Sequence, residues 1–165
     1  MKKVILLTII AIVFFSQNND LVGKEINVKA KETLTIVEMN KGDQLHFELN
    51  NGRIVDIRLI DFNIEIIFTT LDTLKKGDHN DGTIYSMSCQ LEIDGQTMKM
   101  VKYVPVQKSF YEPYVINGLR IWFDALSNLS DYFNENHGEC LPTKDARFAL
   151  QDARLPISPK KLSNW

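Results

Sequence analysis

Cysteine, glycine and proline are scarce in this sequence, and neither sign of charge dominates. Two cysteines, eight glycines and five prolines in 165 residues are too few for a disulfide-built scaffold or a collagen-like or low-complexity chain. The 19 basic and 21 acidic residues give a formal net charge of −2, which excludes a polybasic nucleic-acid binder and an acidic disordered tail. With 44% hydrophobic residues, the chain has the composition of one globular domain that can build its own core.

Motifs for catalysis and cofactor binding are also missing. His46, His79 and His137 are far apart and form no HExxH or HxH pair, and no Cys-x-x-Cys occurs. There is no glycine-rich phosphate loop and no GxSxG elbow. The carboxylate-rich segment 72–82 fails the calcium-loop template, so we expect a polar hairpin loop there, with a weak cation site as the alternative. We therefore predict no catalytic residue, no metal site and no cofactor.

The N-terminus has the pattern of a secretory signal peptide. Lys2 and Lys3 precede an apolar run from Val4 to Phe15, and Ser16 supplies a small residue before a polar stretch. The run is too short to span a bilayer comfortably, and no second one follows. We predict that residues 1–16 are removed and that residues 17–165 form a single exported domain, periplasmic or extracellular, with no membrane span. An uncleaved N-terminal anchor is the alternative.

Two hairpins can be predicted with their register. Gln44 to Leu49 alternates apolar and polar residues, and the alternation resumes after Asn50-Asn51-Gly52. A three-residue loop with left-handed Gly52 pairs Phe47 with Val55 and Leu45 with Ile57. The apolar phase then slips by one residue, which indicates a β-bulge or a corner near Leu59-Ile60.

The second hairpin turns at Asp94-Gly95, a type I′ signal. This turn places Met98 opposite Leu91 and Met100 opposite Cys89. Further strands are predicted at 26–28 and 34–37, and a third hairpin turns at Asn117-Gly118. We therefore expect a mainly-β fold, an antiparallel β-sandwich-like domain.

The C-terminal third suggests a short helical appendix. Trp122, Leu126, Leu129 and Phe133 have helical spacing, and Asp124 is a plausible N-cap. A second short helix is expected from Thr143 to Asp152. We place the two helices near residues 125–136 and 143–152.

Three aromatics and two cysteines are the remaining candidates for function. Phe110, Tyr111 and Tyr114 flank Pro113 and could stack on sugar rings or cover a partner, although aromatics at such a junction more often close a core edge. Cys89 and Cys140 form an even pair in an exported chain, so a disulfide is a candidate. The predicted register alternatively leaves Cys89 as a small buried hydrophobe.

Three segments resemble a region found ahead of lysostaphin-type zinc peptidase domains in some exported bacterial proteins. They lie within residues 117–152: Asn117 to Asp124, His137 to Cys140 and Lys144 to Asp152. That peptidase domain binds zinc through a His/Asp pair and a later His-x-His, and neither can be assigned here. The resemblance therefore implies only the part outside the catalytic domain, with no catalytic residue.

Together these features favour an exported, non-catalytic binding or accessory module of the cell envelope. Its partner would be an envelope polymer or a protein, and not nucleic acid. The alternative is an envelope hydrolase, or the non-catalytic N-terminal part of a lysostaphin-type metallopeptidase. A reading frame that continues past Trp165 into a histidine-rich zinc domain would favour the alternative.

Overall fold

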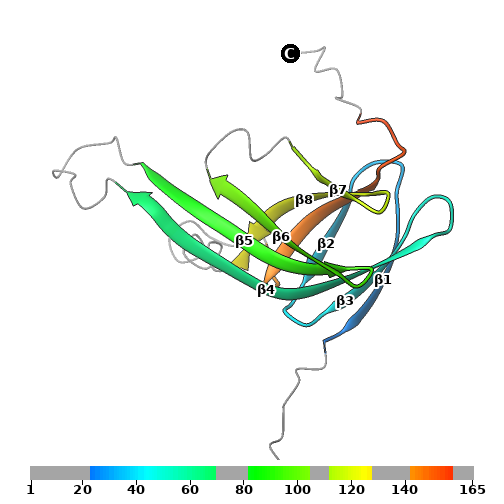
Figure 1. The fold of residues 1–165 in the computed structure, drawn as a ribbon, viewed down its shortest axis with the longest axis horizontal. Helices are drawn as coiled ribbons and strands as arrows, with labels where there is room; N and C mark the ends of the chain where they lie inside the picture. Colours follow the sequence, from blue (N-terminus) through cyan, green and yellow to red (C-terminus); the bar gives the residue numbers. More distant parts are fainter. Residues whose placement is uncertain (1–22, 70–81, 105–111, 128–141, 158–165) are drawn as a thin grey trace, which may run out of the picture.

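A computed structural model describes residues 23–69, 82–104, 112–127 and 142–157. These residues are almost entirely β and form two sheets (Figure 1). The first sheet has the order β1-β3-β4-β5-β6 and the second has the order β2-β9-β8-β7. The strands are β1 (Glu25–Lys29), β2 (Thr35–Met39), β3 (Gln44–Glu48), β4 (Ile54–Thr69), β5 (Thr83–Ile93), β6 (Gln96–Val104), β7 (Tyr114–Ile116), β8 (Leu119–Leu126) and β9 (Ala146–Asp152).

The five-stranded sheet confirms both predicted registers. Phe47 pairs with Val55 and Leu45 with Ile57, while Leu91 pairs with Met98 and Cys89 with Met100. The predicted slip is a bulge between Leu59 and Asp61, but β4 continues along β5 in the same sheet. All neighbouring pairs are antiparallel except β1 with β3, which is parallel. No hairpin connects these two strands, so no local turn signal predicts their pairing.

The two-residue turns have the backbone conformation that their sequences demand. Asp94 and Gly95 have φ of 48° and 78°, and Asn117 and Gly118 have φ of 50° and 76°. Two consecutive left-handed residues define a type I′ turn, whose twist matches the flanking strands. Gly52 is also left-handed, at φ 84°. The three predicted hairpins are therefore confirmed, including the pair β7–β8.

The helix predicted near residues 143–152 is corrected by the structure. Residues 146–152 are the strand β9, which pairs with β2 on one side and β8 on the other. Ala146, Phe148 and Leu150 face the core, and Ala149 and Gln151 on the opposite face are also nearly buried. A central strand with both faces covered loses its period-2 signal and can be mistaken for a helix.

The other expected helix, near 125–136, begins within a strand. Trp122 to Leu126 belong to β8, and Asp124, the expected N-cap, lies at a bulge between Phe123 and Ala125. Residues 128–141 lie outside the described part. Within the described residues no helix is long or apolar enough to cross a bilayer.

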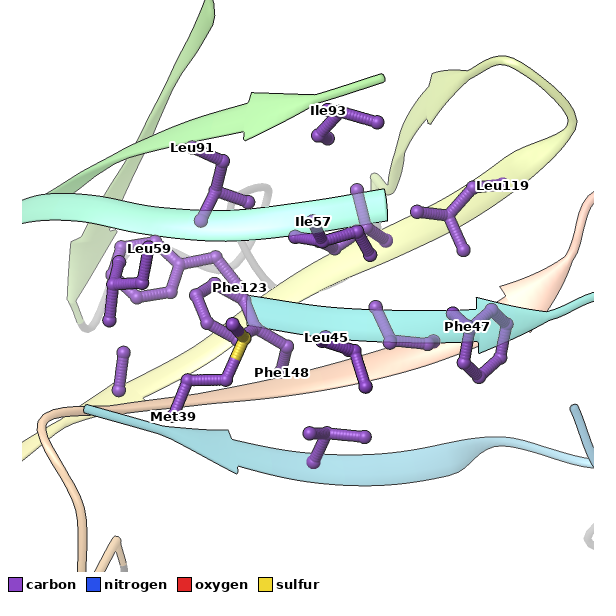
Figure 2. Close-up of a cluster of buried hydrophobic side chains, with 14 of the residues drawn as sticks. Met39, Leu45, Phe47, Ile57, Leu59, Leu91, Ile93, Leu119, Phe123 and Phe148 are labelled. Atoms are coloured by element: carbon purple, nitrogen blue, oxygen red, sulfur yellow. The ribbon is translucent and has the colours of Figure 1, made fainter. Parts of the chain in front are cut away.

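The core draws apolar side chains from both sheets. In Figure 2 the labelled side chains of β3, β4 and β5 meet those of β2, β8 and β9 in the space between the two sets of strands. The largest fully buried side chains include Phe47, Met39 and Phe148. Phe148 stacks on Phe123 with ring centroids 5.8 Å apart, which joins the two central strands of the second sheet inside this core.

The ends of β4 and β5 extend beyond this core as an arm. We define the arm as residues 65–69 and 83–86; in Figure 1 it runs to the left, past the ends of β8 and β9. Beyond Arg58, no described strand pairs with the outer edge of β4. Ile66, Ile67 and Phe68, in the outer half of β4, are each more than half exposed.

Candidate binding surface on the four-stranded sheet

Of the three predicted binding aromatics, Tyr114 is within the described residues, and it has a structural contact. Its hydroxyl accepts a hydrogen bond from the Val101 N–H at 3.0 Å and donates one to the Val101 carbonyl at 3.1 Å. Tyr114 is on β7 and Val101 on β6, the edge strands of the two sheets. The side chain therefore ties one sheet to the other. Phe110 and Tyr111 lie outside the described residues.

Among the described residues Cys89 is a free thiol, about 1% exposed, in the core. Its burial raises its pKa to about 12, so almost no reactive thiolate is present at neutral pH. This placement agrees with the predicted register. Cys140 lies outside the described residues, and the disulfide between the two cysteines stays a prediction.

His46 is within the described residues, and it pairs with an acidic residue on the neighbouring strand. Its Nδ1 lies 2.6 Å from an Asp56 carboxylate oxygen across the β3–β4 hairpin. His79, His137 and nearly all of the predicted polar loop 72–82 fall outside the described part. Among the residues that the structure describes, no group of three His, Cys, Asp or Glu side chains could hold a metal ion.

The outward face of the four-stranded sheet has an apolar centre. Leu119, Ile121 and Phe123 of β8 point into the core, so Arg120 and Trp122 between them point outward. Ala149 of β9 pairs with Trp122 on one side and with Ile36 of β2 on the other. Trp122 is partly buried and Ile36 is about half exposed. We call this row, Trp122–Ala149–Ile36, the Trp122 strip.

Charged side chains border the strip on one side. Arg147 pairs in register with Glu38, and its Nε lies 2.9 Å from an Asp124 carboxylate oxygen. The bulge in β8 carries Asp124 to this position. Glu38 in turn accepts hydrogen bonds from the backbone N–H and the hydroxyl of Thr143. The guanidinium is thus held beside the indole by the sheet and by one carboxylate.

A second guanidinium borders the strip on the other side. Arg120 donates to the Gln151 side chain at 2.7 Å and to the carbonyls of Ala153 and Leu155. These bonds fix the segment after β9 against the sheet. Val115 of β7, next to Arg120 in register, is 63% exposed. The strip therefore lies between two ordered arginines, one at each edge.

Two buried carboxylates stabilise the loops and do not line this surface. Asp152 is fully buried and accepts hydrogen bonds from the Asn50 N–H and from the backbone and guanidinium of Arg154. The Arg154 guanidinium holds the Asp152 pKa far below its ordinary value. For Asp43, burial raises the pKa, but bonds from the Asn40 and Lys24 amides and from Lys144 outweigh it and lower the pKa. Both carboxylates are ionised, and each accepts hydrogen bonds from the neighbouring groups named above.

The Trp122 strip can bind a flat, partly apolar ligand. An indole surface stacks on an apolar ring face, and the Arg147 guanidinium beside it can donate to hydroxyl or carboxylate oxygens. Sequence reasoning missed this surface because Trp122 was assigned to a helical stripe. The strict alternation of Leu119, Ile121 and Phe123 with Arg120 and Trp122 was the signal that could have found it.

Comparison with known proteins gives limited similarity. No family model matches the chain, and no solved structure is significantly similar. Endonuclease MutS2 of Thermotoga neapolitana is 30% identical over 116 residues, which cover 63% of this chain and 15% of that protein. The chain thus spans a small part of the length of this relative.

This comparison corrects the resemblance to the region ahead of lysostaphin-type peptidases. The similarity found is to MutS2 and not to that region. Of the residues that suggested the resemblance, Leu119 to Asp124 lie in β8 and Ala146 to Asp152 form β9, while His137 to Cys140 lie outside the described residues. Their pattern of turn residues and alternating apolar residues is shared by many β-sheets, so it does not identify a family.

Proposed function

We propose that this chain is an exported, non-catalytic binding module of the cell envelope, and that the Trp122 strip contacts an envelope polymer. One observation supports this proposal above the others: Trp122 lies on an outward sheet face between Arg120 and Arg147, each ordered by other groups. A sugar ring presents an apolar face to an indole and hydroxyl groups at its rim. In this proposal the two sheets form an antiparallel β-sandwich, which keeps the binding face rigid.

Export is the part of the proposal that depends on the N-terminal sequence. The Lys2-Lys3 start and the apolar run to Phe15 are typical of a signal peptide. Mass spectrometry of the exported product should show that residues 1–16 are missing. Recovery of an intact chain in the membrane fraction would contradict export as a cleaved protein.

Polymer binding is tested by retention of the purified protein on peptidoglycan and on immobilised envelope glycans. We expect Trp122→Ala to lower retention at least tenfold, because it removes the stacking surface. Phe68→Ala is the matched control, since Phe68 is an exposed aromatic on the arm, which belongs to the other sheet. Circular dichroism should show that both variants are folded. Equal retention of Trp122→Ala and the parent protein would disprove the role of the strip.

The similarity to MutS2 supplies a second candidate. That protein is named an endonuclease, and the alignment with it, which covers 63% of this chain, is 30% identical. By that analogy the chain would be an accessory segment that contacts nucleic acid. Its formal charge of −2 provides little attraction to phosphates. Retention on duplex DNA that falls steeply with salt concentration, together with no retention on glycans, would favour this candidate over the first.

A further inference from the structure

Among the described residues, the outer edge of β4 has no neighbouring strand over a regular stretch. The Gly42 N–H donates to the Leu59 carbonyl, and the Leu59 N–H donates to the Asp43 carbonyl. Beyond Leu59 no described strand pairs with this edge. Between the bulge at Leu59/Asp61 and the shift at Ile66/Phe68, residues 61–66 pair with β5 without interruption. Every second residue of such an edge directs its N–H and C=O away from the sheet. The unpaired groups of this stretch match those of another β-strand.

The stretch also has one apolar and one polar face. Phe62 and Ile64 pack partly against the core, and Ile66, on the same face, is 59% exposed. Asn63 and Glu65 lie on the opposite face, joined by a hydrogen bond of 2.8 Å between their side chains. A partner strand must therefore place apolar residues on one face and uncharged or complementary groups on the other.

From this geometry we propose that the chain forms a two-fold dimer in which β4 pairs antiparallel with β4 of a second copy, with Ile64 opposite Ile64. In this register Phe62 meets Ile66 of the partner subunit on the apolar face. Asn63 meets Glu65 of the partner subunit on the polar face, an amide opposite a carboxylate. The exposed Ile66 becomes covered, and the two five-stranded sheets become one continuous sheet.

The charges select this register over its neighbours. Pairing centred on Asn63 would put Asp61 opposite Glu65 twice, and pairing centred on Glu65 would put two glutamates opposite each other; both are repulsive. A register shifted by one residue would put Ile64 opposite Glu65, so that apolar and polar side chains would share one face of the sheet. Pairing centred on Phe62 would run through the bulge at Leu59/Asp61. The dimer does not depend on the polymer-binding proposal, since β4 and the Trp122 strip are on different sheets.

The test is sedimentation equilibrium of the full chain and of charge variants at position 63. We expect a monomer–dimer equilibrium for the parent protein. Asn63→Asp, which puts like charges opposite Glu65, should raise the dimer dissociation constant about tenfold, and Asn63→Lys should lower it about tenfold. Two-fold symmetry makes each substitution act twice.

Ser88→Asp and Ser88→Lys are the matched controls. Ser88 is on the same sheet face and pairs with Asn63, but it lies on β5, one strand away from the edge. These variants should leave the dissociation constant unchanged. A parent protein that stays monomeric at all concentrations would overturn the proposal. Equal shifts for the Ser88 and Asn63 variants, or weaker association of Asn63→Lys, would overturn the assigned pairing.

Discussion

Asp152 is a buried carboxylate, and an apolar core side chain could not make its hydrogen bonds. It joins the loop after β3, through the Asn50 N–H at 3.0 Å, to Arg154 beyond β9. Such charge-assisted hydrogen bonds contribute more than neutral ones. The side chain also accepts a hydrogen bond from the Arg154 backbone N–H at 3.0 Å. The residue therefore holds two distant loops together at one end of the second sheet.

Stability should fall on acidification because of this residue. The Arg154 guanidinium keeps the folded-state pKa of Asp152 below its ordinary value, so its contribution is complete above about pH 5 and is lost as the pH falls. Asp152→Asn should lower the free energy of unfolding by about 2 kcal/mol at pH 7. In urea titrations from pH 7 to pH 3, the variant should lose less further stability than the parent protein.

Glu32→Gln is the control for this measurement. Glu32 is exposed, so its neutralisation should change neither the stability at pH 7 nor the acid dependence. If the free energy of unfolding of Asp152→Asn falls with pH as steeply as that of the parent protein, other carboxylates cause the loss of stability in acid.

At the scale of strands, Tyr114 links the edge strands of the two sheets, β6 and β7. The Tyr114 hydroxyl occupies the N–H and C=O of Val101 on the edge strand β6. Tyr114→Phe removes both hydrogen bonds and keeps the ring, so we expect a loss of about 1–2 kcal/mol in the free energy of unfolding. Chemical denaturation measures this loss.

The same variant separates a structural role from a binding role. If Tyr114 acts through Val101, polymer retention of Tyr114→Phe should equal that of the parent protein. Reduced retention at unchanged stability would instead restore Tyr114 as a binding residue, as the sequence first suggested.

What could be predicted from the sequence depends on the distance between paired residues. Two hairpins were predicted with register and a third by its turn, because Asn50-Asn51-Gly52, Asp94-Gly95 and Asn117-Gly118 fix local pairing. The strand β9 was missed, because its partners β2 and β8 are distant in sequence and residues on both its faces are buried. The error at β9 also obscured Trp122, so the candidate site became visible only when Ala149 was found beside it.

For the molecule as a whole, β9 completes the core. It lies between β2 and β8 and buries Ala146, Phe148 and Leu150 at 1% exposure or less. Removal of residues 146–165 should therefore leave β2 without a neighbour and abolish the cooperative unfolding transition. Thermal denaturation followed by near-ultraviolet circular dichroism tests this expectation. A truncated chain with the melting temperature of the parent protein would contradict it.

The pairing of β2 with β9 also determines how late in its synthesis the chain can complete the second sheet. Ala146 pairs with Met39, which precedes it by 107 residues. At about 5–20 residues per second, a ribosome needs roughly 5–20 seconds to cover that interval. During this time Val37 and Met39 cannot find their native neighbour, and the newly made N-terminal strands remain incomplete. The four-stranded sheet thus stays incomplete until late in translation, which would suit the export proposed above.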